Sequence, residues 1–150
     1  MNHPSIMRLA VLLAFLVARP VLAGGDVVAH APWIEEGPPN TSVLAGYVDM
    51  ENTSNTPRRL VAVKSPLVDE IMIHVTEVKN GVASMRHVDG LDLPAKGHIV
   101  FKPGGYHLML MGVHGPLKAG DQVPLEFEFA NGEQMRVNAE VRKSGSASPR

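Results

Sequence analysis

Apolar and polar residues alternate in short runs along most of the chain after residue 24, with a period of two rather than 3.6. Glycine, proline and asparagine separate these runs, as they do between the strands of all-β domains. We therefore predict a single all-β domain, a sandwich or barrel. The predicted strands span residues 27–34, 43–51, 59–65, 70–78, 82–87, 98–101, 107–112, 123–129 and 134–141.

Two of the turns have a specific sequence. Asn80-Gly81 and Asn131-Gly132 each separate two predicted strands. Asparagine and glycine tolerate the positive φ angles that both central residues of a type I′ turn require. We predict a type I′ hairpin turn at each of the two positions.

The first 23 residues are typical of a secretory signal peptide. Arg8 precedes an apolar run over residues 9–18, which is shorter than the roughly 20 residues that span a bilayer. Residues 21–23 then supply small side chains at the usual cleavage position. The alternative is an uncleaved N-terminal anchor, which the short run disfavours. The predicted organisation is a signal peptide over 1–23, one domain over 24–142 and a disordered tail over 143–150.

The composition limits the possible kinds of functional site mainly through the absence of cysteine. The 150 residues contain no cysteine, which excludes disulfides, thiolate catalysis and lipid attachment at a cysteine. The net charge is −1 and the basic residues are scattered, so a nucleic-acid-binding surface is not expected. Seven histidines and eight methionines remain as candidate metal ligands.

The predicted strand 70–78 carries aliphatic residues on one face and His74 on the other. If a two-residue turn closes the hairpin with the next strand, Thr76 pairs with Met85 and His74 pairs with His87. Directly paired residues point to the same face of a sheet. His74, Met85 and His87 are therefore expected on the face opposite the core.

The predicted strand 107–112 also has aliphatic residues on one face and candidate metal ligands on the other. Leu108 and Leu110 alternate with His107, Met109 and Met111. Because neighbouring side chains on a strand point to opposite faces, the leucines should enter the core. His107 and Met109 then project together on the other face, with Met111 further along it.

These residues resemble the metal-binding pattern of a known family. Ten residues separate His74 from Met85, twenty-one separate Met85 from His107, and one separates His107 from Met109. This spacing is similar to that of the PCu(A)C-domain family of periplasmic copper chaperones. GYVDMENTS at 46–54 and KPGGYHLMLMG at 102–112 fit the same family, and the similarity covers residues 26–142.

The resemblance implies a cupredoxin-like Greek-key fold and a Cu(I) site made of His74, Met85, His107 and Met109, exposed enough to hand the ion on. It also implies a periplasmic metallochaperone, not an enzyme, that delivers copper for assembly of the cytochrome c oxidase copper site. The implied partners are cytochrome c oxidase subunit II and a thioredoxin-like copper assembly factor.

The donor chemistry agrees with this resemblance. Thioethers are neutral, soft donors that suit Cu(I), and imidazole suits copper and zinc alike. Met72 and Met111 lie on the same faces and are expected at the rim of the site. His87 departs from the family pattern, and it is either a solvent-facing residue or, functionally, a spare ligand or a pH-sensitive gate on release. His30, His98 and His114 have no partner at metal spacing and are expected on the surface.

Other functions remain open at this level. A periplasmic copper scavenging or resistance protein would carry the same site. A copper enzyme would need to cycle through Cu(II), which two thioethers should resist. An inert immunoglobulin-like module would make the spacing of the four ligands a coincidence.

Overall fold

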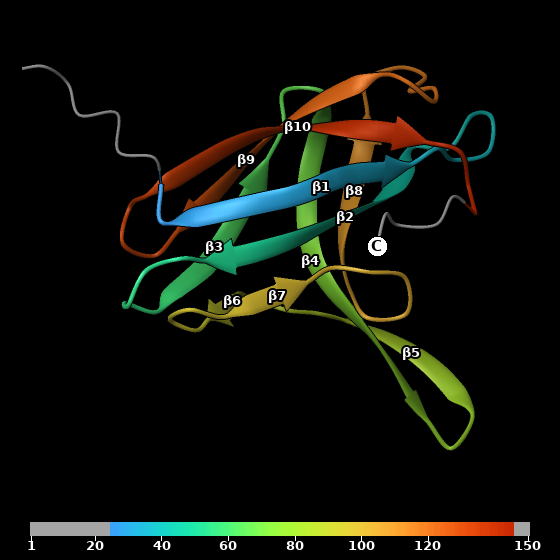
Figure 1. Ribbon diagram of the computed structural model, residues 1–150. Helices are drawn as coiled ribbons and strands as arrows, with labels where there is room; N and C mark the ends of the chain where they lie inside the picture. Colours follow the sequence, from blue (N-terminus) through green and yellow to red (C-terminus); the bar gives the residue numbers. More distant parts are fainter. Residues whose placement is uncertain (1–24, 146–150) are drawn as a thin grey trace, which may run out of the picture.

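The computed structural model describes residues 25–145, which form an all-β domain (Figure 1). Its strands are β1 (Val27–Glu35), β2 (Val43–Asn52), β3 (Arg58–Lys64), β4 (Val68–Lys79), β5 (Val82–His87), β6 (Leu91–Leu93), β7 (His98–Val100), β8 (Tyr106–Val113), β9 (Gln122–Phe129) and β10 (Gln134–Arg142). The signal peptide predicted for residues 1–23 lies outside the described residues, as do residues 146–150 of the predicted tail. Between residues 25 and 145 no helix is long and apolar enough to cross a membrane.

The strands form one hydrogen-bonded path in the order β5-β4-β8-β2-β1-β10-β9-β3-β6, and β7 pairs with β2. The path curls on itself, because β3 and β4, which lie near its opposite ends, contact one another. Antiparallel β2 and β8, and parallel β1 and β10, are neighbours although they are far apart in the chain. Long crossings of this kind are typical of Greek-key arrangements. The predicted all-β Greek-key sandwich or barrel is confirmed.

The interior is filled by inward-facing residues of the strands other than β5, whose residues are all exposed. Ile73 and Val75 of β4, and Leu108 and Leu110 of β8, are buried, as the alternation predicts. They lie on the inner side of a domain whose core includes Ile34, Leu60, Val123 and Phe127. Because the inner faces of β4 and β8 are occupied by these aliphatic residues, their outer faces are available for other side chains.

The predicted strands are found with ends that differ by at most two residues, and one further strand is present. This strand, β6, has a single apolar-polar-apolar alternation, which is too short to distinguish from a loop in the sequence. Leu91 and Leu93 are both buried, and β6 pairs with β3. Tertiary packing, rather than local pattern, makes this segment a strand.

The structure confirms one of the two predicted type I′ turns and contradicts the other. Asn80 and Gly81 have φ angles of 53° and 77°, and Lys79 pairs directly with Val82, so the prediction of a two-residue type I′ turn is confirmed. At the second position the prediction is wrong, because Gly132 has a positive φ of 85° and Asn131 does not.

Hydrogen bonds explain the second turn. The Gly132 amide donates to the Phe129 carbonyl, and the Phe129 amide donates to the Glu133 carbonyl. This is a three-residue loop in which a left-handed glycine follows a type I turn. The Asn131 side chain accepts a hydrogen bond from the Glu133 amide, at 3.1 Å, which stabilises the longer loop.

Arg58 connects the start of the domain to the β9–β10 turn. Its guanidinium lies 2.6 Å from an oxygen of Asp26 and 2.5 Å from an oxygen of Glu133, and its side chain is only 9% exposed. Hydrogen bonds from Arg58, and then from Asn131, lower the pKa of Glu133. The folded state therefore favours the ionised form of this carboxyl group more than the unfolded chain does.

Replacement of Arg58 by methionine should lower the melting temperature at pH 7 by roughly 5 °C. Because the folded-state pKa of Glu133 is lowered, its contribution is present above the unfolded pKa and is lost as pH falls through the folded pKa. The difference between wild type and variant should therefore shrink in thermal melts at acidic pH. Arg59→Met is the matched control, since the Arg59 partner, Asp92, is 77% exposed. Equal shifts for the two variants would contradict this assignment.

Candidate metal centre

Three histidines form a row across adjacent strands on the outer face of the sheet. His74 on β4 pairs directly with His87 on β5 and with His107 on β8. The ring centroids of His74 and His87 are 5.7 Å apart, and those of His74 and His107 are 5.9 Å apart. The hairpin register predicted from the sequence, with Thr76 opposite Met85 and His74 opposite His87, is confirmed.

The His107 ring is held in one orientation by the backbone. Its Nδ1 lies 3.1 Å from the carbonyl oxygen of Gly105, to which an Nδ1–H group can donate. The same carbonyl accepts a hydrogen bond from the Thr76 amide, also at 3.1 Å, so it links β4 to the start of β8. A proton on Nδ1 leaves the lone pair on Nε2, which is the arrangement found in many metal-binding histidines.

Two imidazole nitrogens of this row are buried without a hydrogen-bond partner. They are His74 Nδ1 and His107 Nε2, and neither is bonded by any group within residues 25–145. Buried polar atoms in folded proteins are nearly always paired, because an unpaired one loses its hydration without compensation. A metal ion bound by both nitrogens would supply the partner that each of them lacks.

Burial also favours the neutral form of His74. Desolvation lowers the pKa of His74, and the nearby His107 and His87 lower it further. Only the neutral ring has a lone pair for a metal ion. The lowered pKa therefore extends the pH range in which His74 is able to act as a ligand.

The predicted methionine ligands lie on either side of the histidine row. Met109 follows His107 on the same face of β8 and pairs with Met72, while Met85 pairs with Thr76 on the other side of the row. Met85 is 53% exposed. A hollow of about 310 Å³ brings Met85, His107 and Met109 together. Its lining consists of Val43, Leu44, Ala45, Tyr47, Thr76, Met85, Pro103, Gly104, His107 and Met109.

The four predicted ligands differ in exposure. Met85 on the edge strand β5 is open to solvent, as expected, whereas His107 is only 7% exposed. The sequence led us to expect ligands exposed enough to hand the ion on; Met85 is exposed in this way, whereas His107 is buried. The reason is that β8 lies between β4 and β2, so neighbouring strands and the Pro103-Gly104 turn surround its outer face.

Tyr47 belongs to the site and is missing from the residues singled out in the sequence. It lines the hollow, and its ring packs against that of Trp33, with the ring centroids 4.5 Å apart and the planes tilted by 37°. Burial, followed by the negative charge of Glu35, raises the pKa of Tyr47. The alternation in β2 puts Tyr47 and Ala45 on one face, but only the β2–β8 pairing shows that this face adjoins Met109.

Met72 and Met111 lie where the sequence places them, at the edge of this group. Met72 pairs with Met109, and Met111 pairs with Glu70. Both Met72 and Met111 are partly buried.

His30, His98 and His114 are exposed, as predicted, and each lies beside a carboxylate. In the described part of the chain, no three His, Cys, Asp or Glu side chains form a group able to hold a metal ion. Met85 and Met109 line one hollow with His107, so their thioether sulfur atoms are the additional donors beside the histidine row.

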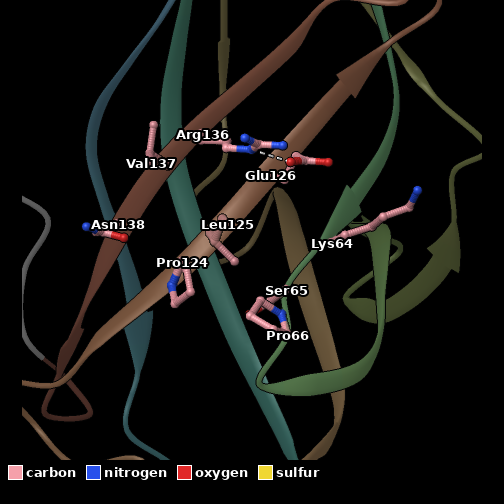
Figure 2. Close-up of a pocket in the computed structure, with 9 residues that line it drawn as sticks. All are labelled: Lys64, Ser65, Pro66, Pro124, Leu125, Glu126, Arg136, Val137 and Asn138. Atoms are coloured by element: carbon pink, nitrogen blue, oxygen red, sulfur yellow. Dashed lines mark hydrogen bonds and ion pairs between the residues drawn. The ribbon is translucent and has the colours of Figure 1, made fainter.

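A larger hollow, of about 530 Å³, lies between β3, β9 and β10 (Figure 2). The Arg136 guanidinium pairs with the Glu126 carboxylate on the neighbouring strand, as the dashed line in Figure 2 shows. Of the nine residues that line it, none is a histidine or a methionine. The metal donors and this hollow are separate features of the surface.

The fold and the outer-face site together define a PCuAC-type domain. The copper-bound PCuAC domain from PmoF2 superposes with a TM-score of 0.68 at 20% identity, covering 79% of this chain and 94% of that one, which shows the shared fold. The CuI form of DR1885 from Deinococcus radiodurans is 32% identical with a TM-score of 0.64, covering 77% of this chain and 78% of that one. "Putative lipoprotein Lxx21020" from Leifsonia xyli subsp. xyli (strain CTCB07) is 29% identical over 126 residues, which is 83% of this chain and 74% of the relative.

The family model described as "Putative lipoprotein LpqE-like" matches residues 27–141, nearly all of the described domain. The chain belongs to this LpqE-like family of PCu(A)C domains. The resemblance inferred from the spacing of histidine and methionine is thereby confirmed at the level of the family.

Proposed function

We propose that the protein binds Cu(I) through His74, Met85, His107 and Met109 and carries it as a metallochaperone. The observation that supports this most strongly is the pair of buried, unpartnered nitrogens, His74 Nδ1 and His107 Nε2, on the face that holds both thioethers. Imidazole and thioether groups bind metals as neutral donors, and no Asp or Glu lines the hollow that Met85, His107 and Met109 share. A monovalent, soft ion suits such a set better than Zn²⁺ or Cu²⁺ does. The CuI form of a relative that is 32% identical agrees with this choice of ion.

We place the protein in the periplasm, after export and removal of the signal peptide at residues 1–23. The family description and one curated relative carry the word lipoprotein, which agrees with export to the cell envelope. The 150 residues printed here contain no cysteine to which a lipid could be attached. Release by cleavage after Ala23 is therefore the form of export that we propose.

The proposed role is delivery of copper for assembly of the cytochrome c oxidase copper site. Subunit II of the oxidase would receive the ion, together with a thioredoxin-like assembly factor. Transfer would occur by ligand exchange, for which the exposed thioether of Met85 offers a point of entry. The chain would hold a cargo and would not need to cycle it between oxidation states, which a site with two thioethers resists. A copper scavenging or resistance protein with the same site is the alternative role.

Deletion of the gene separates these two roles. If the protein delivers copper to the oxidase, the deletion strain should lose most of its cytochrome c oxidase activity at limiting copper and recover it when copper is added. Its tolerance of high copper should stay near that of the wild type. Complementation with the wild-type gene should restore activity, whereas a gene encoding His107→Gln and Met109→Leu should not. Unchanged oxidase activity combined with a clear loss of copper tolerance would contradict delivery and support scavenging.

A further inference from the structure

His87 is the member of the histidine row that the four-ligand site does not use. It lies on β5, directly opposite His74, and its side chain is 51% exposed. Its Nε2 lies 3.2 Å from a carboxylate oxygen of the exposed Asp89. The two rings meet edge to face at 5.7 Å, which is slightly closer than the 5.9 Å between His74 and His107. His74 therefore has an equivalent imidazole neighbour on each side.

Both separations are close to that required for two imidazoles to share one metal ion. A metal lies about 2.0 Å from a histidine nitrogen, so two rings on a tetrahedral ion have centroids roughly 5 Å apart. Adjustments of under about 1 Å would bring either pair to this value. His87 and His107 lie on strands that flank β4, so they are about two strand spacings, roughly 10 Å, apart. One ion therefore binds His74 with one of these two imidazoles at a time. The longer and more flexible Met85 side chain lines the hollow beside His107, which His87 does not, and so can serve both positions.

The two positions differ in which part of the fold supplies the donors. The inner position takes His107 and Met109 from β8, where His107 is 7% exposed. The outer position takes His74, Met85 and His87, all from the β4–β5 hairpin. Met85 and His87 are two residues apart on one strand and share its outer face.

The hairpin is also the most accessible part of the site. β5 is the edge strand of the path and every one of its residues is exposed. Figure 1 shows the β4–β5 hairpin extending away from the body of the domain, with its turn free of the other strands. A copper-accepting protein can approach this hairpin without displacing core elements.

We propose that His74, Met85 and His87 form an outer exchange position for Cu(I), from which the ion leaves the protein. This rests on the proposed function and adds a route for release. Copper would keep its bond to His74 while the bonds to His107 Nε2 and the Met109 sulfur break and a bond to His87 forms. The exchange replaces one set of neutral nitrogen and sulfur ligands with another. No electron is transferred, and copper stays Cu(I). The acceptor then displaces the hairpin ligands in solvent.

His87→Gln tests this route with the mature protein loaded with Cu(I) under anaerobic conditions at pH 7. We expect the equilibrium affinity to change by less than about threefold, since the inner ligands are intact. The rate at which copper passes to bicinchoninate should fall by about tenfold or more, which is in the range for loss of one supporting group at a metal site. His114→Gln is the matched control, because His114 is exposed to the same extent, 51%, and lies away from the row.

A second variant tests the outer position when the inner donors are absent. In His107→Gln with Met109→Leu, the weak residual binding of Cu(I) should fall by a further tenfold or so when His87→Gln is added. Transfer by His87→Gln at the wild-type rate, or an unchanged residual affinity in the triple variant, would overturn the exchange position. In either case Cu(I) binding by the wild type would still support the proposed function. Failure of the wild type to hold Cu(I) would instead overturn the function itself.

Discussion

Replacement of both His107 and Met109 by alanine should lower the affinity of the protein for Cu(I) by at least about a hundredfold. The variant removes two of four donors, including His107 Nε2, whose orientation is fixed by the Gly105 carbonyl. Loss of a single supporting group at a metal site costs roughly 10–100-fold in affinity, and here two direct ligands are lost. Competition with bicinchoninate at pH 7, under anaerobic conditions, measures the change.

The control must separate loss of ligands from loss of structure. His107 is buried, so alanine leaves a cavity that could destabilise β8. His107→Gln with Met109→Leu keeps most of the side-chain volume and should lose copper to a similar extent. His114→Ala with Met135→Ala removes the same two residue types away from the site and should bind Cu(I) as the wild type does. Full affinity in both variants at positions 107 and 109 would contradict the assigned ligands.

Replacement of Asn52 by alanine should lower the free energy of unfolding by about 3 kcal/mol. Asn52 is completely buried at the end of β2. Its Nδ2 donates to the Thr56 carbonyl at 2.8 Å and to the Leu93 carbonyl at 3.4 Å. Its Oδ1 accepts from the amide and from the hydroxyl of Ser54, at 3.0 and 2.8 Å. Alanine removes these four hydrogen bonds, including the buried one to the Leu93 carbonyl, and opens a small cavity.

Denaturation by urea, followed by circular dichroism, measures this loss of stability. Asn55→Ala, at an exposed position in the same loop, is the matched control and should change stability by less than about 0.5 kcal/mol. Because Asn52 joins β2 to β6 and lies away from the histidine row, the variant should still bind Cu(I) while it is folded. A loss below about 1 kcal/mol would contradict the structural role assigned to this side chain.

Much of the site could be predicted because it depends on local rules. The period-two alternation places His74 and His107 opposite the buried aliphatic residues, and Asn80-Gly81 determines the register that pairs His74 with His87. The pairing of β4 with β8 is not local, and the sequence pattern alone gives no register for it. It was the resemblance to the PCu(A)C family that joined His107 to His74.

What could not be predicted depends on neighbours that are distant in the chain. Leu91–Leu93 becomes a strand because it packs on β3, and Tyr47 reaches the site because β2 pairs with β8. The burial of His107 follows from the central place of β8 in the sheet. At Asn131-Gly132 the dipeptide favours a type I′ turn, but hydrogen bonds between Phe129 and Glu133 select a longer loop.

X-ray absorption at the copper edge of the Cu(I)-loaded mature protein tests the central claim most directly. It counts the sulfur and nitrogen atoms bound to the ion, whatever the copper is later used for. The proposed site predicts a copper shell that contains both the thioether sulfurs of Met85 and Met109 and the imidazole nitrogens of His74 and His107. A shell of nitrogen and oxygen atoms without sulfur would contradict it.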